Sequence, residues 1–191
     1  MSRSGVVLAG GASRRFGGDK LAEPIDGIPL LERSIAALTG LVDEIIVVVA
    51  PNRPAPSLER ARTTPIRIVA DPEAFGGPLV GLRTGLEAAL GATVIVVGGD
   101  MPSMRPAVLE LLLTRPSAAL GDHGGVLRPL PCSLDRASAL LAADALLASG
   151  ERRLRALLTS VDTTMVPWRD WQAVDPSGLT LVDIDERSDL P

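Results

Sequence analysis

Apolar residues along the chain fall into short continuous runs, separated by stretches in which they recur every three or four positions. A continuous apolar run predicts a strand that is buried on both faces. Such runs occupy residues 6–9, 44–50 and 93–97, and a further strand is expected at 66–70. Helical spacing predicts a helix over 29–41, with Pro29 at its first position, and another over 82–90. This alternation is typical of a largely parallel sheet with helices on both faces.

The second half of the chain continues the alternation with shorter and less regular segments. Helical spacing recurs at 106–113, 136–147 and 152–158. Short strands are expected at 118–120, 126–127, 163–166 and 179–184. Because these strands are short and unevenly spaced, we expect the sheet to become mixed here. The sequence contains no internal repeat and no long linker, so we expect residues 1–191 to form a single α/β domain.

Composition narrows the classes of function that the chain can have. Hydrophobic residues make up 46% of the chain but aromatic residues only 2%, so the core must consist of aliphatic side chains. Few aromatic residues argue against a surface that stacks single-stranded bases. The net charge of −4 argues against a nucleic-acid or anionic-membrane surface. No apolar run approaches the roughly 18 residues of a membrane span, so we expect a cytoplasmic protein.

Cysteine and histidine occur once each, as Cys132 and His123. A single cysteine forms no internal disulfide, and metal sites built from several Cys and His side chains are excluded. Cys132 is expected to be a small buried hydrophobe. His123, in a glycine-rich turn, is expected to face solvent, with contact to an acceptor substrate as the alternative. Trp168 and Trp171 are expected to seal a helix or loop against the core, and stacking on a ligand is the alternative.

The loop that follows the first predicted strand is the strongest candidate for chemistry. It runs from Gly10 to Lys20 and fits neither the Walker A spacing nor the G-x-G-x-x-G of dinucleotide binders. Its paired glycines allow backbone amides to approach a polyphosphate, and Arg15 and Lys20 can neutralise the charge. Lys20 is the only lysine among 19 basic residues, which favours a specific role for an ammonium group. The alternative is an ordinary loop with solvated charges.

Two further polar clusters follow predicted strands. Asp71 precedes a rigid Gly-Gly-Pro turn at 76–78 whose backbone can face a base, although a plain connection is the alternative. Asp100 follows the strand at 93–97 and two glycines. Because ligands bind at the carboxyl ends of parallel strands, we expect these clusters to meet the opening loop there. A carboxylate at Asp100 suits Mg²⁺, and a helix cap is its alternative role.

The residues in these clusters resemble the signature of the molybdenum cofactor guanylyltransferase family and its nucleotidyltransferase relatives. The resemblance spans nearly the whole chain in order. It comprises L-A-G-G-x-S-x-R-F-G with Asp19-Lys20, the G-x-P-L-L segment from Gly27, Asp71 with Gly77-Pro78-Leu79-x-Gly81, Gly99-Asp100-Met101-Pro102, Gly150-Glu151-Arg152-Arg153, and Leu181-Val182-Asp183-Ile184-Asp185. From the residues alone, the arginines at 152, 153 and 155 are equally well explained as a solvated helix start or as a site for an anionic acceptor.

The resemblance implies a role for each matched position. Backbone groups of four consecutive residues would hold the nucleotide, namely Leu8, Ala9, Gly10 and Gly11. Arg15 and Lys20 would contact the triphosphate and, with Asp100, form the catalytic group. Guanine or its ribose would be recognised by Asp71, Gly77, Pro78 and Leu79. Asp100 would hold Mg²⁺. Asp183 and Asp185 stand where many members have Asn, and we expect Asp185, before Asp183, to supply a second metal ligand.

The resemblance also implies a fold and a reaction. The expected fold is a three-layer Rossmann-like nucleotidyltransferase with a mostly parallel mixed sheet. Residues of about 1–105 would bind GTP, and about 106–191 would bind a molybdopterin-type acceptor. The chain would transfer GMP from MgGTP to the acceptor phosphate, with transient contacts to cofactor-biosynthesis or acceptor proteins. Two alternatives stay open: a nucleotidyltransferase that uses CTP or another triphosphate with a different phosphorylated acceptor, and a non-catalytic nucleotide-binding protein.

Overall fold

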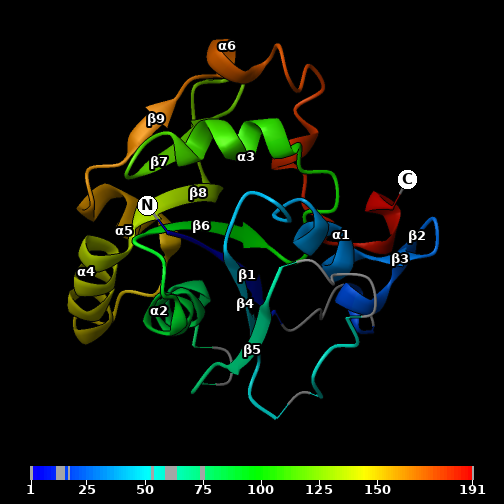
Figure 1. The fold of residues 1–191 in the computed structure, drawn as a ribbon, viewed down its shortest axis with the longest axis horizontal. Coiled ribbons are helices and arrows are strands. Elements are labelled where there is room, and N and C mark those ends of the chain that lie inside the picture. Colours follow the sequence, from blue (N-terminus) through cyan, green and yellow to red (C-terminus); the bar gives the residue numbers. More distant parts are fainter. Residues whose placement is uncertain are drawn as a thin grey trace.

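The computed structural model describes residues 2–11, 16, 18–52, 54–58, 64–73 and 76–190. Within these residues, seven strands form one sheet in the order β5-β4-β1-β6-β8-β7-β9 (Figure 1). The first four strands in the sequence of this sheet are β1 Arg3–Ala9, β4 Glu44–Val49, β5 Ile66–Ala70 and β6 Thr93–Gly98. These four strands are mutually parallel, which confirms the predicted parallel sheet.

The remaining strands make the sheet mixed, as predicted. They are β7 Ala118–Gly121, β8 Leu127–Asp135 and β9 Thr164–Val166, and only β8 runs antiparallel to its neighbours within the described sheet. The strand predicted at 126–127 begins at Leu127 but is longer than expected, because β8 has nine residues. Pro129 and Pro131 concealed its extent. Both lie in the part of β8 that does not pair with β6, where the pairing with β7 is irregular and a missing N–H costs little.

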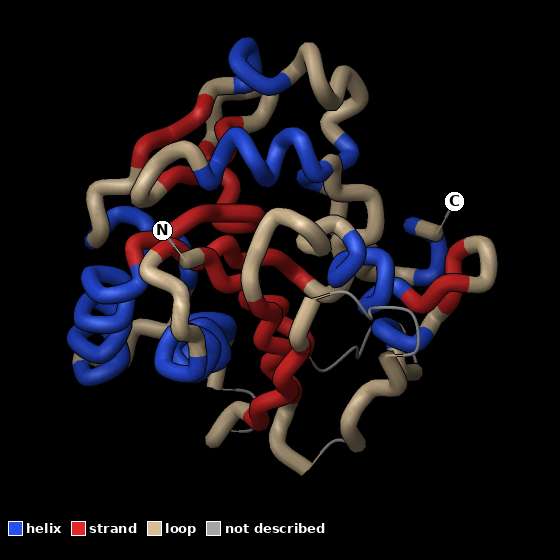
Figure 2. Tube along the Cα trace, viewed as in Figure 1, coloured by secondary structure: helices blue, strands red, loops and turns tan. Residues whose placement is uncertain are grey.

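Helices cover both faces of the sheet. One face carries α1 Leu30–Ala36, α3 Pro106–Leu113 and α6 Trp168–Trp171. The other carries α2 Pro78–Ala88, α4 Arg136–Ala148 and α5 Leu154–Ser160. Figure 2 shows the strands as a band between these helices. Alternate strand residues divide between the two cores, as when Val7 packs with the α1 and α3 side and Val6 with the α2 side. None of the described helices combines the length and the apolar character needed to cross a membrane.

Two further predicted elements differ from the structure. The helix predicted over 29–41 ends at Ala36, and Pro29 is its N-cap, because it pairs with Pro24 in the small hairpin of β2 Pro24–Ile25 and β3 Ile28–Pro29. The strand predicted at 179–184 is wrong. Residues Leu179–Leu181 form the 3₁₀ helix η2, since both Leu179 and Thr180 donate their N–H groups to the buried carboxylate of Asp175.

The C-terminal segment returns to the first half of the chain. In Figure 1 its red end lies beside α1 and the β2–β3 hairpin. Ile184 is buried with Phe16 and Leu30, and its N–H donates to the carbonyl oxygen of Asp100 at 2.9 Å. A short 3₁₀ helix, η3 Arg187–Asp189, closes the segment. Residues far apart in the sequence therefore meet at the end of β6.

Candidate functional site

The carboxyl ends of four parallel strands meet at one edge of the sheet. Ala9 pairs with Val49 across β1 and β4, and Leu8 pairs with Gly98 across β1 and β6. The segments that follow these strands therefore start side by side. This is the edge at which open α/β sheets bind ligands.

A pocket of about 360 Å³ opens at this edge. Seven of the predicted site residues line it: Leu8, Gly10, Gly11, Asp71, Gly77, Pro78 and Asp100. Seven further residues line it, of which only Gly76 belongs to a turn that the sequence had indicated: Val48, Ala50, Glu73, Gly76, Gly81, Gly98 and Leu130. Gly81 belongs to the quoted G-P-L-x-G motif, which was the available signal. Leu130 comes from β8, whose pairing beside β6 could not be inferred from its proline-rich sequence.

Missing side chains help to create the pocket. A Cβ atom on Gly81 would lie 3.2 Å from Asp71 Oδ2 and close to the side chains of Val48 and Leu8. A Cβ on Gly98 would lie 2.5 Å from Asp100 Oδ1, a separation that real Cβ atoms do not show. The glycines thus leave room for two carboxylates that face the same space.

Asp71 places a buried hydrogen-bond acceptor on the pocket wall. Its residue is 8% exposed, its N–H donates to Val49 O at 2.8 Å, and its Oδ1 accepts the N–H of Glu73 at 3.1 Å. Burial raises the pKa of Asp71, the Glu73 N–H opposes that rise, and the nearby Glu73 carboxylate adds to it. A group that donates hydrogen bonds is the natural partner for such a carboxylate.

Lys20, Asp100 and Asp185 form a charged cluster beside the pocket. Lys20 Nζ lies 2.8 Å from Asp100 Oδ2 and 3.3 Å from Asp185 Oδ1, and the Lys20 residue is only 8% exposed. Desolvation alone would lower the pKa of Lys20, but its bonds to the two carboxylates raise the pKa above the usual value. Lys20 is therefore a fixed cation between two carboxylates.

The local fold explains how the charged cluster is assembled. Lys20 begins the 3₁₀ helix η1 Lys20–Ala22, which Asp19 caps by accepting the N–H of Leu21. Asp185 is brought in by the neighbouring Ile184, which is tied to the Asp100 backbone. The N–H of Asp185 donates to Asp189 Oδ2 at 2.9 Å, which fixes the turn.

Other predicted site residues lie elsewhere. Ala9 lines a second cavity, of about 300 Å³. Leu79 is fully buried in the core, and its N–H donates to Arg152 O. Asp183 is exposed, whereas Asp185 is half-buried and contacts Lys20. Arg15 lies outside the described residues.

The structure settles the environment of the single cysteine, the histidine and the tryptophans. Cys132 is buried, as predicted, and its burial raises the pKa of the thiol to about 12, so it is not a nucleophile. His123 is exposed, as predicted, but its ring centroid lies 3.8 Å from that of Trp168. Trp171 is fully buried and donates to Gly121 O, which confirms that it seals the core.

Comparison with known proteins gives consistent names. A family described as "MobA-like NTP transferase domain" matches residues 5–165. A Chloroflexus aggregans protein named "Probable molybdenum cofactor guanylyltransferase" is 36% identical, with 100% of this chain and 92% of that protein covered. A Mycobacterium avium protein of the same name is 32% identical, with 100% and 94% covered. The crystal structure of "Molybdopterin-guanine dinucleotide biosynthesis protein A" from Archaeoglobus fulgidus superposes with a TM-score of 0.78 at 21% identity, with 98% and 94% covered, and shows the same fold.

Proposed function

Because the chain belongs to the family of MobA-like NTP transferase domains, we propose that it transfers GMP from GTP to the phosphate of a molybdopterin-type cofactor and releases pyrophosphate. The chain is a nucleotidyltransferase by its family. The names of its relatives support the choice of guanine and of the acceptor. The observation that carries the proposal is a single pocket with a buried carboxylate at one side and the charged cluster at the other.

Asp71 favours guanine by its chemistry. Guanine presents two neighbouring donors, the ring N1–H and the exocyclic amino group, which match a carboxylate that only accepts. Cytosine presents one donor, its amino group, beside acceptors that a carboxylate repels. Gly77 and Pro78 line the same pocket as Asp71. We therefore assign the base to this side and the triphosphate to Gly10, Gly11 and Lys20.

The donor set of the charged cluster fits Mg²⁺. Asp100 and Asp185 converge on one ammonium group, so their oxygens already point at a common position, and hard carboxylate oxygens are the ligands that Mg²⁺ prefers. When bound there, Mg²⁺ would neutralise charge on the triphosphate. Asp183, which is exposed, is not needed for this arrangement.

The reaction requires positioning and charge neutralisation from the chain. A phosphate oxygen of the acceptor attacks the α-phosphorus of GTP, the bond from the α-phosphorus to the bridging oxygen breaks, and pyrophosphate leaves. The acceptor phosphate is already ionised, so no general base is required. Lys20 stabilises the charge that develops on the leaving group, and we assign the same role to Arg15.

We also propose that the two halves of the chain bind different substrates. We assign nucleotide binding to residues of about 1–105 and acceptor binding to about 106–191. Two residues of the second half, Leu130 and Asp185, nevertheless belong to the nucleotide side through the pocket and the charged cluster. Transient contacts with proteins that supply or receive the cofactor would then fall on the second half.

A nucleotide panel tests the proposal. Calorimetry with GTP, CTP, ATP and UTP, each with Mg²⁺, should show tightest binding of GTP. Pyrophosphate release should then require both GTP and molybdopterin. Tightest binding of CTP would instead favour the cytidylyltransferase alternative, and GTP binding without pyrophosphate release would favour a non-catalytic binder.

A further inference from the structure

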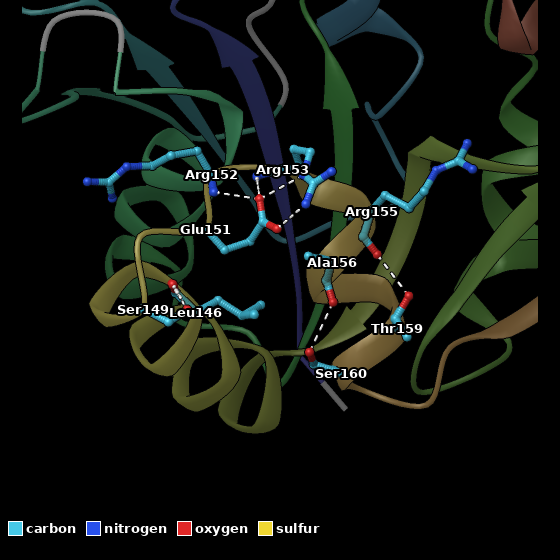
Figure 3. Close-up of polar contacts among 9 residues, drawn as sticks. All are labelled: Leu146, Ser149, Glu151, Arg152, Arg153, Arg155, Ala156, Thr159 and Ser160. Atoms are coloured by element: carbon cyan, nitrogen blue, oxygen red, sulfur yellow. Dashed lines mark hydrogen bonds and ion pairs between the residues drawn. The ribbon is translucent and has the colours of Figure 1, made fainter.

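The turn between α4 and α5 is held together by one carboxylate. Glu151 Oε1 accepts the backbone N–H groups of Arg152 at 2.8 Å and Arg153 at 2.9 Å, and also Arg153 Nε at 2.9 Å. Its Oε2 bonds to the same guanidinium at 2.5 Å. Figure 3 shows the Glu151 carboxylate turned toward these groups, while the Arg152 guanidinium points away. These bonds lower the pKa of Glu151 to about 2, so it is ionised at any working pH.

The same turn contacts the wall of the pocket. The carbonyl oxygen of Arg152 accepts the N–H of Leu79 at 3.1 Å, in the first turn of α2. Gly77 packs so closely on the turn that a Cβ would lie 2.9 Å from Arg152 Cβ. The φ of Gly77 is +94°, a conformation that L side chains rarely adopt. Arg152 also reaches Glu73, another lining residue, at 3.9 Å.

Peptide geometry links these two observations. The carbonyl of Arg152 and the N–H of Arg153 belong to one planar peptide unit, in which they point in opposite directions. When Glu151 holds the N–H of Arg153, it therefore also directs the Arg152 carbonyl toward Leu79. A turn that only connected α4 to α5 would need neither the bond from the Arg153 N–H to Glu151 nor the bond from the Leu79 N–H to the Arg152 carbonyl.

We propose that Glu151 is a positioning residue for binding of the nucleotide base. Through Arg152 it holds the Gly77-Pro78 wall at the distance that the base requires. This inference rests on the proposed function, because it assumes that the base lies against that wall. It also connects the half that we assign to the acceptor with the nucleotide pocket.

Glu151→Ala tests the inference when two ligands are compared. Calorimetry with Mg²⁺ should show a Kd for GTP raised about tenfold, the equivalent of one charged hydrogen-bond network. The Kd for inorganic triphosphate, which lacks a base, should stay within about twofold. Glu151→Gln keeps an acceptor oxygen for the backbone N–H groups, so it should recover GTP affinity to within about threefold of wild type.

Each result decides between positioning and a merely structural role. Equal weakening of GTP and triphosphate in Glu151→Ala would show general loosening and overturn the inference, as would unchanged GTP affinity. Glu110→Ala, which removes an exposed carboxylate from α3, is the matched control and should bind both ligands as wild type does. Absence of GTP binding by the wild-type protein would instead overturn the proposed function itself.

Discussion

The pocket wall at Asp71 and the charged cluster lie at one edge of the sheet, but they are held in different ways. The wall is built from backbone. Gly77 is pressed against Arg152, Gly81 leaves space beside Asp71, and the Leu79 N–H is tied to the next segment. The charged cluster is built from side chains that are far apart in the sequence, since Asp100 lies 80 positions and Asp185 165 positions after Lys20.

This contrast indicates which side can rearrange. Backbone held by tight packing has few alternatives, which suits the recognition of a flat base. A lysine between two carboxylates has a second arrangement, because both carboxylates and the ammonium can exchange partners when a cation and a polyphosphate arrive. We therefore expect substitutions in the cluster to affect the rate of transfer, and substitutions at the wall to affect the choice of base.

The largest effect is expected for Asp100→Asn. The change keeps the shape of the side chain but removes the charge that Lys20 and a divalent cation require. The rate of pyrophosphate release with saturating GTP and acceptor should fall about 100- to 1,000-fold, as for the loss of a principal electrostatic group. GTP affinity should change much less, because the wall is intact. A rate above one tenth of wild type would remove Asp100 from the catalytic group.

Asp71→Asn should alter which base is bound. The amide loses one acceptor and gains a donor, so GTP should bind about 10- to 100-fold more weakly. Xanthosine triphosphate has a carbonyl where guanine has its amino group, so it should bind to Asp71→Asn more tightly than to wild type. Calorimetry with GTP and with xanthosine triphosphate measures the affinity of wild type and variant for each nucleotide. Parallel losses for the two nucleotides would mean that Asp71 acts on the sugar or on the fold.

Residues that directly follow the parallel strands could be located from the sequence for a physical reason. The strands β4 and β6 are nearly continuous apolar runs, and a polar residue directly after a strand of this parallel sheet must lie at its carboxyl edge. Asp71 and Asp100 were found in this way. The residues at 179–184 looked like another strand, but their backbone is satisfied by Asp175. No local pattern indicates that Asp185 then reaches Lys20.

The full length of β8 could not be predicted from the sequence because of its prolines. β8 contains Pro129 and Pro131, which argue against a strand when only the local sequence is read. The strand forms because its second part, Cys132–Asp135, pairs with β6, and Cys132 and Ser133 also pair with β7. Leu130 reaches the pocket as a consequence, which no spacing in the sequence could indicate.

Lys20→Met tests whether the ammonium group competes with a divalent cation for the two carboxylates of the charged cluster. In the free protein the ammonium bonds to both carboxylates, so a cation must compete with it. Removing the ammonium should tighten Mn²⁺ binding to the nucleotide-free protein about tenfold, in line with the loss of one charged competitor. Paramagnetic resonance of free Mn²⁺ measures this directly. Arg169→Met, which removes an exposed cation on α6, is the control, and equal Mn²⁺ affinity in Lys20→Met and wild type would contradict the competition.

The smallest effect is expected for Asp185→Asn, which is compared with Asp183→Asn. The Asp185 side chain is 46% exposed and 3.3 Å from Lys20 Nζ, so water screens its charge more than that of Asp100, which is 27% exposed. Asp185→Asn should therefore lower the transfer rate only about three- to fivefold and weaken Mn²⁺ binding by a similar factor. Asp183→Asn is matched in chemistry and lies two positions away, but its side chain is exposed, so both quantities should stay within about twofold of wild type. If Asp183→Asn were instead the more damaging change, the C-terminal segment would have to turn over when nucleotide binds, and the bond from the Ile184 N–H to Asp100 would have to break.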